Sequence, residues 1–109
     1  IVENAALAIG QGVPVIAKDN DWVHMETLKP ELMAVLQSGN WKLAQNGLQH
    51  YTGHYVQGVQ KKGIPPEQIN AIKSWIATAE KTIAALQQQE TIQQTAQAIV
   101  AAKGAQTIT

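Results

Sequence analysis

The stretch INAIKSWIATAEKTIAAL, from Ile69 to Leu86, decides the fold class of this chain. Its apolar residues recur alternately three and four positions apart, which is the spacing that lines one face of an α-helix. They are Ile69, Ile72, Ile76, Ala79, Ile83 and Leu86. Pro65-Pro66-Glu67 precedes the stretch, and both proline and glutamate are favoured in a first helical turn. The sequence therefore predicts a helix that presents a heptad-like seam to another helix.

The helical pattern continues beyond Leu86, but its apolar face changes phase. Polar Glu90 and Gln93 fill the next seam positions, and such a shift unwinds or redirects a helix pair. The apolar set restarts as Ile92, Ala96, Ile99 and Val100. The whole helix would span roughly 38 residues and about 57 Å. Because the mean helix has only about 11–12 residues, we expect it to be interrupted or to serve assembly.

The segment 87–98 is rich in glutamine, alanine and threonine. Its apolar side chains are few and small, so a lone helix of this composition is only marginally stable. Identical copies packed side by side would stabilise it, because small side chains let helices approach closely. We therefore predict self-association through the seam and its continuation at Ile92 and Ile99. The alternative is a frayed or disordered tail.

The first half of the chain predicts shorter elements. A first helix should stop at Gly10, and residues 13–17 suit a brief extended segment. A turn follows at 18–21, where Asp21 is suited to cap a single helical turn. Pro30 fits the first position of the next helix, which ends at Ser38-Gly39.

A further helix should begin at Trp41 under an Asn40 cap and close at Gly63. Its apolar stripe comprises Trp41, Ala44, Leu48, Tyr51, Tyr55 and Val59. Three internal glycines, each costing about 1 kcal/mol relative to alanine, require tight packing or a bend. The expected fold is mostly α, with helical hairpins in 1–64 and a long helix in 65–109. The aromatic residues expected to anchor its packing are Trp22, Trp41, Tyr51, Tyr55 and Trp75.

Composition excludes several classes of function. Lys+Arg and Asp+Glu each number 8 in 109 residues, and every basic residue is lysine. A neutral chain has no long-range field to attract nucleic acid or anionic membrane. The absence of cysteine excludes disulfides and thiolate zinc sites. No apolar run approaches the roughly 20 residues of a membrane span.

Two groups of residues are candidates for metal chemistry. His50 and His54 stand four apart on one helix, a spacing that chelates metal, but Tyr51 replaces the glutamate of the metalloprotease motif. The alternative is that both imidazoles flank the tyrosine stripe and bond backbone or water. Asp19 and Asp21 match the first ligands of a calcium loop whose remainder is missing, so a turn and cap role is favoured. We expect no metal, no cofactor and no enzymatic activity.

Residues 10–55 resemble the C-terminal region of bacteriophage portal proteins, the head-to-tail connectors. The resemblance lies in a helix ending in Gly10-Gln11-Gly12, then Val13-Pro14-Val15 and the acidic turn Asp19-Asn20-Asp21 leading to His24. A leucine-containing helix, Ser38-Gly39-Asn40 and a helix with His50-Tyr51 and His54-Tyr55 follow. A second histidine often found soon after the acidic turn is replaced here by Thr27-Leu28.

The resemblance implies a structural subunit of a homo-oligomeric ring of roughly twelve copies at a capsid vertex. In that family DNA passes non-specifically through the channel, and other portal-vertex or tail proteins bind the ring. The long helix would belong to a crown or barrel within the virion, and both ends of the sequence read as cuts through a longer polypeptide. Two alternatives remain: a helical scaffold or adaptor module that uses the 69–86 seam to bind a partner helix, and a metal-dependent enzyme built on His24, His50 and His54.

Overall fold

The computed structural model describes residues 20–108, and side chains from 20 to 103. Helix α2 spans Asp21–Ser38, α3 spans Trp41–Gln60, the 3-10 turn η1 spans Pro66–Gln68, and α4 spans Ile69–Ile108. The described part contains no strand, so the mostly α fold with a long C-terminal helix is confirmed. The predicted helix ending at Gly10 and the extended segment near residues 13–17 lie outside the described residues.

Helix α2 begins nine residues earlier than the sequence pattern indicates. Asn20 caps it, with its side-chain oxygen accepting a hydrogen bond from the Val23 N–H at 3.3 Å. Asp21 is therefore the first helical residue instead of the cap. Pro30 lies inside the helix, so the prediction that it starts a helix was wrong.

Tertiary packing explains how α2 continues through a proline. A proline inside a helix removes one backbone hydrogen bond and costs about 3 kcal/mol. Here Pro30 is exposed, whereas Met25, Leu28 and Leu32 on the opposite face are at most 2% exposed. Burying these three side chains contributes roughly 1.5–3 kcal/mol each, which outweighs the proline penalty.

The turn between α2 and α3 follows the predicted signals. Gly39 adopts φ 81°, a left-handed conformation that glycine adopts without steric cost, and ends α2 after Ser38. Asn40 caps α3, with its side-chain oxygen accepting from the Leu43 N–H at 3.2 Å. The predicted helix boundary at residues 38–41 is confirmed.

The C-terminus of α3 uses a different residue from the one expected. Lys62, with φ 56°, takes the left-handed position, and the Gly63 N–H donates to the Gly58 carbonyl at 2.8 Å. This bond and that from the Lys62 N–H to the Val59 carbonyl form a Schellman closure. Gly58 has a separate steric role, because a Cβ there would lie 2.7 Å from the Ile64 Cδ1 atom.

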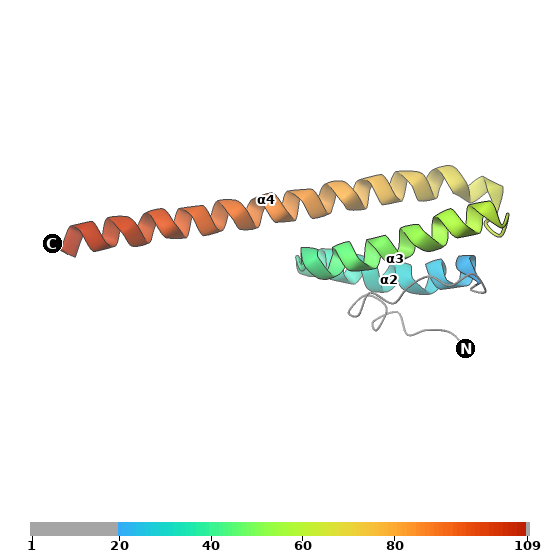
Figure 1. Ribbon diagram of the computed structural model, residues 1–109, viewed down its shortest axis with the longest axis horizontal. Coiled ribbons are helices and arrows are strands. Elements are labelled where there is room, and N and C mark those ends of the chain that lie inside the picture. The colour runs from blue at the N-terminus through green and yellow to red at the C-terminus, as the bar shows by residue number, and fades with distance from the viewer. Residues whose placement is uncertain (1–19, 109) are drawn as a thin grey trace.

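Helix α4 runs back along the α2–α3 hairpin and then continues past its end (Figure 1). It is one continuous helix to residue 108, so the expected interruption does not occur. The longest dimension is 67 Å, against 27 Å and 19 Å across. A single core is shared by the three helices and by Ile64. None of the helices in the described part is long and apolar enough to cross a membrane.

Candidate self-association surface

The predicted seam of α4 divides into two parts. Its first six members pack within the chain, where Ile72, Ile76, Ala79 and Ile83 belong to the buried core and are at most 8% exposed. Ile69 and Leu86 are half-buried at the two ends of this stretch. The partner of the 69–86 seam is thus the chain's own hairpin, principally α3.

The last two members of the seam lie on the part of α4 that extends beyond the hairpin. Ile92 is 60% exposed and Ile99 is 51% exposed, and the neighbouring Val100 is 70% exposed. All side chains from 91 to 103 are exposed. We call Ile92, Ile99 and Val100 the distal stripe. Its self-association stays a prediction.

Helix geometry places the distal stripe away from the hairpin. At 100° per residue, Ile92 and Ile99 point roughly 170° away from the mean direction of Ile72, Ile76, Ala79 and Ile83, and Val100 points roughly 90° away. The change of phase in the sequence therefore places Ile92 and Ile99 on the opposite side of the same continuous helix. A partner helix can reach the distal stripe without displacing α2 or α3.

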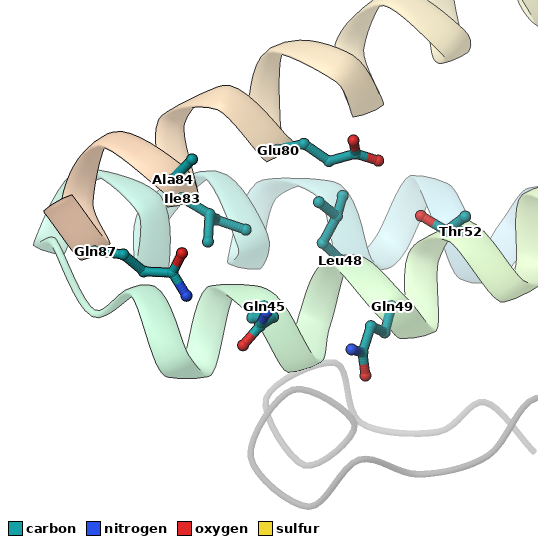
Figure 2. A pocket seen from close by; sticks show the side chains of 8 residues that line it. All are labelled: Gln45, Leu48, Gln49, Thr52, Glu80, Ile83, Ala84 and Gln87. Carbon is teal, nitrogen blue, oxygen red and sulfur yellow. The ribbon is translucent and has the colours of Figure 1, made fainter.

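A groove of about 440 Å³ separates α3 from α4 near the distal end of the hairpin. Leu48, Ile83 and Ala84 supply its apolar lining, and the other lining residues are polar: Gln45, Gln49, Thr52, Glu80 and Gln87. Figure 2 shows these side chains on the two facing helices. The groove has no cluster of nucleophile, base and oxyanion donors.

The five predicted packing anchors lie at helix contacts, but only one is fully buried. Tyr51 is 2% exposed and contacts Trp75, with ring centroids 4.8 Å apart. Trp22, Trp41, Tyr55 and Trp75 are half-buried and pack against the core. Trp41 also donates its indole N–H to the Glu90 carboxylate of α4. This contact joins the first turn of α3 to the point where α4 leaves the hairpin.

The structure also assembles a buried polar cluster that the sequence did not predict. His54, which is fully buried, places Nδ1 2.8 Å from Asp21 Oδ1 and Nε2 3.1 Å from His50 Nε2. Gln57 donates to the same Asp21 oxygen at 2.9 Å, and the Lys61 ammonium lies 2.9 Å from Oδ2. The sequence-based alternative had both imidazoles bond backbone or water, and the structure shows that each of them also contacts a buried side chain.

Ionisation within the fold favours a charged Asp21 and a neutral Tyr51. Burial acts to raise the pKa of Asp21, but hydrogen bonds from His54, Lys61 and Gln57 outweigh it and lower that pKa below its usual 3.8. Burial, with a smaller contribution from the Glu26 charge, raises the pKa of Tyr51 to about 12. Asp21 thus acts as the anion that organises the N-terminus of α2 against α3.

His24 completes the cluster by stacking on His54, with ring centroids 4.7 Å apart and an interplanar angle of 17°. Within residues 20–108, no three carboxylate or imidazole groups are arranged to hold a metal ion. Asp19, the other residue of the proposed calcium turn, lies outside the described residues. The spacing of His50 and His54 was the one signal in the sequence for this cluster.

Comparisons with protein-family models, with curated proteins and with solved structures find no match to this chain.

Proposed function

We propose that this chain is a structural, non-enzymatic element of a homo-oligomeric ring, in which α4 packs against α4 of neighbouring copies. The observation that carries the proposal is the distal stripe, an apolar surface on a projecting helix that its own hairpin leaves uncovered. Exposed apolar surface of this kind marks interaction sites. A second copy of the same helix offers a complementary apolar surface.

The setting we propose is the crown and barrel of a bacteriophage portal, with roughly twelve copies around a closed axis. The resemblance of residues 10–55 to that family supports this setting. The helical hairpin beside a long projecting helix is compatible with it. Portal-vertex or tail proteins would be further partners, and the virion would be its location.

The charge of the projecting helix agrees with a channel that DNA passes without specific binding. From residue 91 to residue 108 the only ionisable side chain is Lys103, and arginine is absent throughout. Protein–DNA affinity depends on lysine and arginine that neutralise phosphates. DNA in such a channel would therefore meet mainly amide, hydroxyl and methyl groups.

A scaffold or adaptor module is the second candidate function. From the sequence, such a module would bind a partner helix through the 69–86 seam. In the structure, however, that seam packs against the chain's own hairpin. An adaptor would therefore use the distal stripe for a different partner helix, and would not form a ring with copies of itself.

Native mass measurement of the protein that carries this segment tests the two candidates. The portal proposal expects a closed ring near twelve subunits, whereas a monomer or dimer contradicts it. The variant Ile92→Ser/Ile99→Ser/Val100→Ser should dissociate the ring. The control Gln94→Ser/Ala101→Ser changes exposed positions that point roughly 100° or more away from each residue of the distal stripe, and should leave the ring intact.

A further inference from the structure

The side of the molecule where α3 and α4 run next to each other carries a hollow of about 210 Å³. Its lining includes Tyr55 and Val56 of α3 and Lys73, Ala77 and Glu80 of α4. We call these five residues the flank patch. Val56 is 49% exposed, and Lys73, Ala77 and Glu80 are exposed as well. The patch therefore combines exposed apolar surface, which marks interaction sites, with one charge of each sign.

The two charges of the flank patch stand at fixed places on α4. Lys73 and Glu80 are two helical turns apart, about 10 Å along the axis, and point in nearly the same direction. In the part of the chain that the structure describes, neither charge has an ion-pair partner. Glu80 also lines the adjoining groove shown in Figure 2. Both charges are therefore available to a second molecule.

The order of these charges makes the patch complementary to a copy of itself that runs in the opposite direction. A two-fold axis perpendicular to α4, passing between Ile76 and Ala77, places each Lys73 opposite the Glu80 of the second copy. The same axis brings the two Ala77 side chains together. A parallel copy in the same register would instead place like charges against each other, which is unfavourable. The patch thus favours one occupant, a second copy in the antiparallel direction.

We propose that the flank patch is a second self-association surface, through which two copies of this chain pair antiparallel. Two Lys73–Glu80 ion pairs flank the apolar contacts of Val56 and Ala77. The contact is isologous, because both copies use the same surface. It is also weak, since exposed ion pairs contribute little each and the apolar part of the patch is small.

This pairing is separate from the proposed ring and does not rest on it. At 100° per residue, Lys73 and Glu80 point roughly 100° away from Ile92 and Ile99 of the distal stripe, so one copy can use both surfaces. Neighbours within one ring run in the same direction, whereas the flank patch joins copies that run in opposite directions. Removing the distal stripe should therefore leave the antiparallel pair intact.

Charge reversal tests the proposal in the 109-residue chain that carries Ile92→Ser/Ile99→Ser/Val100→Ser. Sedimentation at protein concentrations from roughly 10 µM to roughly 1 mM should show a monomer–dimer equilibrium. Lys73→Glu and Glu80→Lys each turn two attractions into two repulsions, so each should raise the dimer Kd about tenfold or more. An equimolar mixture of the two variants restores both attractions and should form a heterodimer.

The matched control is Lys81→Glu. It makes the same charge change as Lys73→Glu at an exposed position of α4 that points roughly 80° or more away from Lys73 and Glu80. The dimer Kd should stay within about twofold of its original value.

Single cysteines test the direction of pairing, because the chain contains none of its own. Ala77→Cys lies beside the two-fold axis and should give a disulfide-linked dimer under oxidation. Ala84→Cys lies two turns farther along α4, where an antiparallel pair separates the two thiols, and should not cross-link. A parallel pair would cross-link at both positions.

A chain that stays monomeric over the whole concentration range would overturn the proposal and leave the hollow to a different occupant. Unchanged dimerisation in Lys73→Glu and Glu80→Lys would overturn it too, as would a mixture of the two that stays monomeric. None of these results depends on the ring. Conversely, a wild-type parent protein that forms no ring would contradict the proposed function and leave the antiparallel pair standing.

Discussion

Trp41, in the first turn of α3, donates its indole N–H to the carboxylate of Glu90, 49 residues later in α4. The contact fixes the point where α4 stops packing on the hairpin and begins to project, since every side chain from 91 to 103 is exposed. The same carboxylate accepts an exposed hydrogen bond from Gln94 at 3.2 Å. Glu90 therefore belongs to both the packed and the projecting part of α4.

Replacing Trp41 with Phe should loosen α4 where it leaves the hairpin. The substitution keeps most of the aromatic surface but removes the N–H that binds a charged acceptor. The expected loss is about 1–2 kcal/mol, with faster hydrogen exchange in residues 86–90. Gln94→Ala removes the exposed bond to the same carboxylate and serves as the control, with an expected change below about 0.5 kcal/mol. Equal effects of the two variants would contradict the assigned role of Trp41.

Asp21→Asn should destabilise the fold at neutral pH by about 2 kcal/mol. This loss of stability is moderate because the Lys61 side chain, which forms an ion pair with Asp21, is 40% exposed and can be solvated when the pair is broken. Since the pKa of Asp21 is lowered in the folded state, its contribution is present above pH 3.8 and is lost as the pH falls through that value toward the folded pKa. Urea denaturation at several pH values measures the effect.

In that experiment, the stabilities of wild type and Asp21→Asn should converge at the acid end of the series. Glu67→Gln is the control, because Glu67 is an exposed carboxylate and its replacement should change stability by less than about 0.5 kcal/mol. A constant difference between wild type and Asp21→Asn across the acid range would show that the charge of Asp21 is not the stabilising feature.

Tyr51 should make the fold sensitive to alkali. Its pKa rises from 10.0 to about 12 in the folded state, so its contribution is complete below pH 10 and is lost as the pH rises from 10 toward 12. The loss is on the order of 2 kcal/mol. In Tyr51→Phe, the free energy of unfolding should fall less steeply over this range. Phenolate absorbance should show one tyrosine, absent from the variant, that ionises above pH 11.

Pro30→Ala should stabilise the chain. Pro30 is exposed and lies inside α2, where it leaves the Glu26 carbonyl without its usual i+4 backbone donor. Alanine supplies that N–H and has the highest helix propensity, so thermal unfolding should shift upward by the equivalent of about 1–3 kcal/mol. Pro66→Ala, in the η1 turn, is the control and should give no comparable gain. A destabilised Pro30→Ala would mean that the proline shapes the packing of α2.

The sequence by itself determined the local elements of this protein. Gly39 and Asn40 end one helix and start the next because their backbone and side-chain preferences act within a few residues. The three- and four-residue spacing from Ile69 to Leu86 likewise identified a helix with one packing face. It also located the change of phase near Glu90, although it did not show that α4 continues without interruption through this point.

Only the tertiary structure decided which surfaces meet. It showed that the 69–86 seam packs on the chain's own hairpin, and that the distal stripe remains exposed. It also decided that α2 continues through Pro30, because the free energy gained by burying side chains on the opposite face of the helix outweighs the cost of a proline inside it. It also joined Asp21 to His54 across 33 residues and Trp41 to Glu90 across 49. Contacts over such separations depend on how helices pack, and no local pattern in the sequence specifies that packing.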